Sequence, residues 1–420
     1  MKISITRPSI GCIGISLFLF AMYSIGTISA MTVSWTFTLI LLIIACALFF
    51  LAFAKCRATS TSTLIIVWAI LTIFCFIGVI RGNSITLLGF YILCLAVLAM
   101  SPAISADSLF VSLKWFKFFG LVFSFGCYWQ YLFPDQYYTR IYPLFGEEYH
   151  QSIRRQFTFH KMCTGFTSQT AVAAGFIILG IMAVLYLYSR RETKKRRMIS
   201  IIEMIFLIGG LLLTGKRSPI LNLGAAIIFV YMLTVKRSKK VNRILAVFLG
   251  IVVALTALYF LVPLFSGSRN SIVRLLESLN DLSEAFNGRL SLYGFAISEF
   301  IKHPILGIGW GRYSLLYDIT GVHNIYLQLL CECGIIGFLL SVFGMIYTLS
   351  RTIRMLKGEA SNINSTVSIL LKCSVFIQVY ILVYGLLGNP LYDQNYLLMY
   401  CMGIIMAVVA QYSRVNESHS

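Results

Sequence analysis

Residues 36–54, TFTLILLIIACALFFLAFA, form an apolar run that contains no charged side chain. A helix needs about 20 such residues to cross the roughly 30 Å hydrocarbon core of a bilayer. The run therefore predicts a transmembrane helix. Further apolar runs of about this length bring the expected number of spans to about twelve, near residues 9–29, 63–80, 84–100, 109–133, 167–188, 199–213, 219–234, 244–264, 324–349, 367–388 and 396–412.

The composition gives the same fold class. Of the 420 residues, 59% are hydrophobic and only 12% are charged, which is too little polar surface for a soluble protein of this length. We therefore expect an all-α, polytopic integral membrane protein. The run nearest the N-terminus, 9–29, is followed by further spans and lacks a small-residue cleavage pattern, so we interpret it as an anchor. Without a repeat or a linker, residues 1–420 are expected to form a single membrane domain.

The net charge of +19 reflects membrane topology rather than nucleic-acid binding. If the N-terminus is cytoplasmic, most of the 34 Lys and Arg residues lie on the inner side, including the runs RRETKKRR (190–197) and KRSKK (236–240). This is the positive-inside distribution of short loops. The same topology predicts two long extracytoplasmic loops, near 134–165 and near 265–322, and function is expected there.

The second long loop carries the most informative motif. It reads NGRLSLYGFAISEFIKHPILGIGWGRY (287–313) and is followed by HNIYLQLLCECGIIG (323–337). The apolar residues Leu290, Phe295, Ile297 and Ile301 alternate with polar ones, which predicts a short helix over 289–302 that rests on the membrane surface. Pro304 should end this helix. The glycines that follow allow a sharp turn, either beside a ligand or as a re-entry turn without one.

These motifs, together with TGKRSP (214–219), resemble the O-antigen polymerase and ligase family of integral membrane glycosyltransferases. The resemblance implies a protein of the bacterial inner membrane with an extracytoplasmic active site. It also implies an undecaprenyl-diphosphate-linked glycan donor, an inverting displacement, and no cofactor. The expected partners are the lipid-linked donor and acceptor, membrane lipids, chain-length regulators and flippases, and no nucleic acid.

The resemblance gives three residues catalytic roles. His323 would be the general base, because neutral imidazole can take a proton from a sugar hydroxyl near neutral pH. Arg217 and Arg289 coincide with the family's arginines and would bind the diphosphate through their planar guanidinium groups. The alternatives are a structural histidine at a helix end and arginines that extend to lipid phosphates.

Three further residues are candidates for substrate binding. Asn324 either caps the helix that starts beside it or orients the imidazole of His323. Lys216 precedes Arg217, and Asp393 lies in the last outer loop, GNPLYDQN (388–395). For Lys216 we favour a topological role, whereas for Asp393 a structural and a site role are equally supported.

Other reactive side chains are expected to be structural. Glu332 lies two helical turns inside an expected span and should be paired or protonated, with a structural pairing favoured over catalysis. Cys331 and Cys333 should pack. No metal site is expected, because the outer loops lack clustered ligands; Glu147 and Glu148 come nearest. Arginine should therefore replace a metal ion at the diphosphate.

The expected reaction transfers a glycan from the lipid-linked donor to a sugar hydroxyl. We favour a polymerase, because TGKRSP and GNPLYD look more like polymerase than ligase segments; a ligase would use lipid A core as the acceptor. A lipid-linked oligosaccharide flippase is the alternative of another class. Flippases need polar groups along their spans, and only Glu203, Glu332 and Lys372 lie within or near the expected spans.

Overall fold

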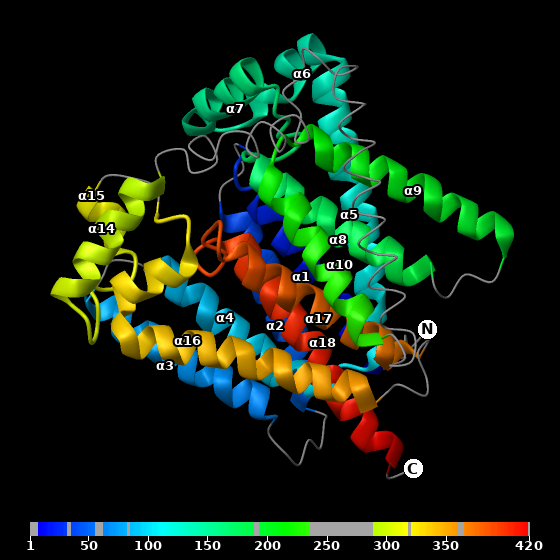
Figure 1. The fold of residues 1–420 in the computed structure, drawn as a ribbon. Coiled ribbons are helices and arrows are strands. Elements are labelled where there is room, and N and C mark those ends of the chain that lie inside the picture. Colours follow the sequence, from blue (N-terminus) through cyan, green and yellow to red (C-terminus); the bar gives the residue numbers. More distant parts are fainter. Residues whose placement is uncertain are drawn as a thin grey trace. The chain divides into compact units, whose positions relative to one another are not determined.

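The computed structural model describes most of the chain as helices joined by loops (Figure 1). An isolated β-bridge between Met31 and Phe145 is the sole β pairing in this described part. The all-α expectation is therefore confirmed. The described residues are 7–31, 35–54, 62–81, 85–188, 193–234, 289–317, 321–358 and 365–418.

Among the described residues, eight helices are long and apolar enough to cross a membrane, as expected for a polytopic membrane protein. They are α2 (Trp35–Ala54), α3 (Thr63–Arg81), α5 (Ala106–Leu132), α8 (Thr170–Tyr188), α10 (Arg217–Thr234), α16 (Ile325–Gly358), α17 (Thr366–Tyr384) and α18 (Gln394–Ser418).

Three more of the expected runs are helical but less suited to spanning. Helices α1 (Arg7–Ile25) and α4 (Ile85–Met100) contain shorter apolar segments. Helix α9 (Lys194–Leu213) begins with four consecutive basic residues, which makes it less apolar than the spans. The expected run at 244–264 lies outside the described residues, so the total of about twelve spans stays a prediction.

The chain divides into two compact units. Unit 1 comprises Met1–Phe18, Ile43–Phe110 and Phe286–Ser420, and unit 2 comprises Leu19–Leu42 and Val111–Ala285.

Unit 2 packs α5, α8 and α9 closely together. A side chain at Gly120 of α5 would come within 2.6 Å of the Cα atom of Gly180 on α8, so the two glycines allow a close approach of the helices. Lys117 of α5 forms a 2.7 Å ion pair with Glu203 of α9. Between α5 and α8 the expected outer loop folds into α6 (Pro134–Arg140), the 3₁₀ turn η2 (Tyr142–Leu144) and α7 (Glu147–His160).

Unit 1 contains a bundle of α3, α4, α16, α17 and α18, with the 3₁₀ turn η1 (Ser101–Ala103) beside α18. Within this bundle, Gln378 of α17 donates from Nε2 to the hydroxyl of Thr352 on α16 at 3.0 Å and so links the two helices. It also donates to Ser374, one turn earlier in α17, at 3.0 Å. The short helices α14 (Arg289–Lys302) and α15 (Arg312–Tyr317) pack against α16. The expected helix over 289–302 is thus confirmed, and it ends before Pro304 as expected.

Candidate active site

The helix that follows His323 is broken. At Gly334 the backbone has φ 64° and ψ −170°, so α16 consists of a first segment, 325–333, and a second segment, 335–358. A break leaves backbone N–H and C=O groups without partners inside the helix, and in a membrane protein these groups must be satisfied by other protein atoms.

The glycine-rich segment 303–310 supplies those partners. Ile308 N donates to Cys331 O at 3.0 Å, and Gly309 N donates to Glu332 O at 2.9 Å. On the C-terminal side of the break, Ile335 N donates to Pro304 O at 2.8 Å. Gly307 has φ 65°, and a side chain there would collide with the backbone of Glu332. Gly307 therefore allows the close approach of two backbones.

Glu332, in the first segment of α16, forms hydrogen bonds with the start of α15. Its carboxylate is buried and accepts hydrogen bonds from Gly311 N at 2.7 Å and from Tyr313 N at 3.0 Å. Gln328 Nε2 approaches the same carboxylate at 3.5 Å. Hydrogen bonds from backbone N–H groups satisfy the oxygens of this buried side chain, which would otherwise be costly to bury. The expected structural pairing of Glu332 is thereby confirmed.

His323 lies at the turn that leads into the first segment of α16. Its φ is 58°, in the left-handed region that few residues other than glycine adopt. Just after it, Asn324 Oδ1 accepts hydrogen bonds from Tyr326 N at 3.0 Å and Leu327 N at 3.1 Å. Asn324 therefore caps the helix, which is the simpler of its two expected roles. His323 itself is half-buried.

The turn at His323 is attached to the C-terminal end of α17. Ile325 N donates to Gly385 O at 2.8 Å, and the Tyr326 hydroxyl donates to Leu382 O at 2.7 Å. The turn at His323 therefore lies against the end of α17, while Arg289 begins α14, which packs against α16.

Asp393 caps the helix that follows it. Its Oδ1 accepts hydrogen bonds from Asn395 N at 2.9 Å and Tyr396 N at 3.4 Å, at the start of α18. Burial raises the pKa of this carboxyl above its ordinary value. A capping role accounts for the residue type at this position, and a contact with substrate stays a prediction.

Helix α14 buries two of its side chains and exposes several of its large apolar ones. Ala296 and Glu299 are buried, whereas Leu290 and Ile301 are 66% and 70% exposed. Phe295 and Ile297 are exposed as well. These four are the residues expected to face the membrane surface, and their exposure leaves them available to do so. Arg289 is half-buried at the first position of the helix.

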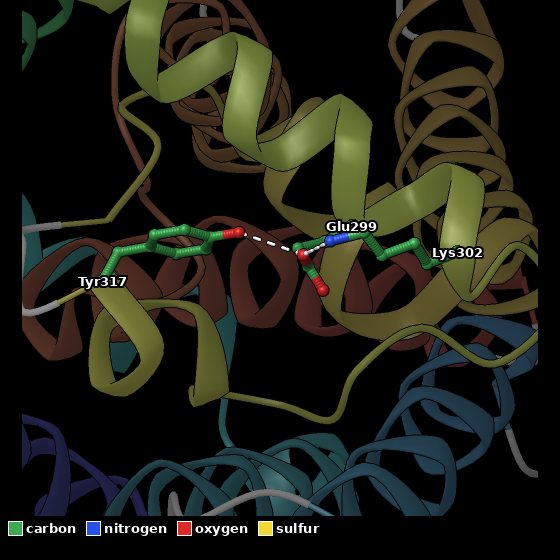
Figure 2. Close-up of polar contacts among 3 residues, drawn as sticks. All are labelled: Glu299, Lys302 and Tyr317. Carbon is green, nitrogen blue, oxygen red and sulfur yellow. Dashed lines mark hydrogen bonds and ion pairs between the residues drawn. The ribbon is translucent and has the colours of Figure 1, made fainter.

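A three-residue contact joins the other end of α14 to α15 (Figure 2). Glu299 Oε1 accepts from Lys302 Nζ at 2.7 Å and from the Tyr317 hydroxyl at 3.0 Å. The ammonium group of Lys302 lowers the pKa of Glu299. The sequence interpretation missed this contact. The i,i+3 spacing of Glu299 and Lys302 could have revealed the ion pair, but no local signal pointed to Tyr317.

The remaining two predicted site residues belong to unit 2. Arg217 is the first residue of α10, and Lys216 precedes it in a turn that Gly215 makes with φ 67°. Beside this turn, Cys163 N donates to Leu213 O at 2.9 Å. Lys216 and Arg217 are both half-buried. Each arginine is thus placed within its own unit, and the convergence of Arg217 with Arg289 and His323 stays a prediction.

Side chains that could hold a metal ion are scattered. Within the described ranges, no three His, Cys, Asp or Glu side chains are grouped at ligand spacing. Glu147 and Glu148 are exposed in the first turn of α7. The cysteines Cys163, Cys331 and Cys333 are buried, in keeping with a packing role for the last two.

These features define a class of protein: a polytopic helical membrane protein whose polar groups gather beside a broken helix. Residues 202–342 match the family described as O-antigen ligase. The match covers about a third of the chain and contains Arg217, Arg289, His323 and Asn324. It confirms the similarity to the O-antigen polymerase and ligase family and supports a function of this type in the synthesis of cell-surface polysaccharide. No curated protein matches the chain.

Proposed function

We propose that this protein is a polysaccharide polymerase of the O-antigen or capsular type. It transfers a glycan from an undecaprenyl-diphosphate carrier to a sugar hydroxyl of a second lipid-linked repeat unit, on the extracytoplasmic face of the bacterial inner membrane. The observation that carries the proposal is the packing of α14, which begins at Arg289, against α16, which begins just after His323. Both residues lie inside the segment that matches the family.

In this reaction, His323 takes the proton of the acceptor hydroxyl as the hydroxyl oxygen attacks the anomeric carbon of the donor. The bond between that carbon and the diphosphate oxygen breaks, and the diphosphate leaves with its electron pair. Arg289 and Arg217 bind the leaving diphosphate and stabilise the negative charge that develops on it. Attack opposite the leaving group inverts the configuration of the anomeric carbon.

The test is the lengthening of a defined lipid-linked repeat unit by purified protein in detergent. We expect products of two or more repeats with the wild-type protein and a strong loss with His323→Ala. A flippase would produce no lengthening in detergent, where no membrane separates two compartments. Transport in proteoliposomes without lengthening in detergent would replace the polymerase proposal with the flippase.

Ligation is the second candidate, because the matching family is described as O-antigen ligase. A ligase and a polymerase would use the same donor and the same base, and they would differ in the acceptor. The assay should therefore offer lipid A core and a lipid-linked repeat unit in parallel. Transfer to lipid A core alone would identify a ligase.

A further inference from the structure

Tyr313 contacts two helices through its two ends. Its backbone N–H donates to Glu332 Oε1 at 3.0 Å, and its hydroxyl donates to Leu292 O at 2.9 Å. The side chain is fully buried, with 0% exposure. Tyr313 therefore joins the first segment of α16 to the beginning of α14.

Both ends of this connection lie close in sequence to proposed site residues. Leu292 follows Arg289 by three residues, so it belongs to the same first turn of α14. Glu332 follows His323 by nine residues and lies on the helical segment that starts at the His323 turn. The path from Arg289 to His323 therefore runs through two short helical pieces and the contacts of Tyr313 and Glu332.

Several features support this path. The hydroxyl of Tyr313 is protonated and can donate at physiological pH even at its ordinary pKa of 10.0, and burial raises that pKa further, to about 12. The carboxylate of Glu332 also holds Gly311, which fixes α15 at a second point. Around the ring, Tyr313 belongs to a buried apolar cluster with Ala296, Ile308, Val322 and Cys331.

We propose that Tyr313 and Glu332 are positioning residues that hold Arg289 in a fixed place relative to His323. This inference rests on the proposed function. The diphosphate bound by Arg289 and the acceptor hydroxyl at His323 must be kept at reacting distance, and small displacements of such groups reduce the rate strongly. Tyr313 and Glu332 act through other residues and do not touch the substrate.

The test compares Tyr313→Phe with Tyr317→Phe. Both substitutions remove one phenolic hydroxyl from α15, but the Tyr313 hydroxyl holds the Arg289 end of α14 and the Tyr317 hydroxyl holds the far end. We expect Tyr313→Phe to lower kcat by about 5- to 10-fold, the usual effect of one lost hydrogen bond, while Tyr317→Phe stays within about twofold of wild type. Equal losses in both variants would overturn the proposal.

A second readout separates positioning from general stability. Affinity for undecaprenyl diphosphate is measured for Tyr313→Phe in the wild-type background and in Arg289→Ala. If Tyr313 acts through Arg289, the substitution weakens binding in the first background and has no further effect in the second. Equal losses in both backgrounds would contradict the positioning role of Tyr313 and would leave the proposed function unaffected.

Glu332→Gln provides a further variant that keeps the size of the side chain. One of its two acceptor oxygens becomes a donor, so it should repeat the same non-additive loss of binding. If Arg289→Ala binds undecaprenyl diphosphate with wild-type affinity, Arg289 does not bind the diphosphate as the proposed function requires. The positioning role of Tyr313 and Glu332 would then be rejected as well.

Discussion

His323 combines a reactive side chain with an unfavourable backbone conformation. A residue with a Cβ atom at φ 58° costs roughly 1 kcal/mol, and such strain is often found at functional sites. The sequence identified the imidazole as a candidate base, but it did not predict the left-handed turn, because only a small minority of histidines adopt that conformation.

The first prediction concerns this side chain. His323→Ala should reduce the rate of polymerisation by about 10² to 10⁴, the usual range for the loss of a general base. His303→Ala is the control, because His303 is exposed and follows α14 in the same loop; it should retain wild-type activity. Product lengths from purified protein measure both. Normal chain length with His323→Ala would remove His323 from the mechanism.

The second prediction concerns the arginines. Arg217→Lys and Arg289→Lys should both be strongly impaired although they keep the positive charge, because lysine cannot bind two phosphate oxygens through a planar fork. Arg312→Lys is the matched control: Arg312 is exposed, and its guanidinium approaches only the Ile308 carbonyl, at 3.4 Å, among described residues. Initial rates at saturating donor test all three. Full activity of either predicted variant would indicate a lipid contact instead.

The break in α16 depends on two glycines. Gly334 has φ 64°, and a side chain there would collide with the carbonyl of Ile305; Gly307 faces the same restriction against Glu332. Gly334→Ala and Gly307→Ala should each lower the free energy of unfolding by about 3 kcal/mol or more. Thermal unfolding in detergent measures this loss.

Gly294 provides the control for that prediction. It lies inside α14 and has open space around the position of a side chain. Gly294→Ala should therefore leave stability unchanged or raise it by up to about 1 kcal/mol, because alanine favours helix more than glycine does. If Gly334→Ala behaves like Gly294→Ala, the backbone contacts at the break contribute little to folding.

The contact between α14 and α15 should depend on pH. Lys302 lowers the pKa of Glu299 below its ordinary value of 4.5, so the ionised carboxylate stabilises the folded state. That stabilisation is present above pH 4.5 and is lost as the pH falls through the lowered pKa. Hydrogen exchange of residues 289–317, corrected for intrinsic rates, should accelerate in the wild type as the pH falls through the lowered pKa of Glu299. Glu299→Gln should show no such additional change.

The sequence was informative for some elements and silent for others. Apolar runs located the spans and the 289–302 helix, because hydrophobic length and periodicity are local properties. The cap at Asn324 was also foreseen. The break at Gly334 was not, since a glycine within an apolar run such as CECGIIG is compatible with an unbroken span. The contacts of Tyr313 with Leu292 and Glu332 arise only when separate segments pack, so spacing could not reveal them.

At the scale of the whole molecule, the two proposed arginines belong to different compact units. The prediction that arginine replaces a metal ion therefore concerns the complete protein. Polymerisation should continue in excess EDTA, because fixed cations can stabilise the leaving diphosphate in place of a divalent ion. Turnover is compared with and without added magnesium or manganese. Loss of activity in EDTA that magnesium restores would direct attention to Glu147, Glu148 and Asp393 as ligands.

The break in α16 at Gly334 also has a consequence for the synthesis and membrane insertion of the chain. Residues 303–310 leave the ribosome before α16 does, and the carbonyl groups of Pro304 and Ile305 later accept the N–H groups of Ile335 and Ile336. Exposed N–H groups are costly in lipid. The hydrogen-bond acceptors are therefore already synthesised when the second segment of α16 enters the bilayer. The order of translation thus favours correct insertion of this span.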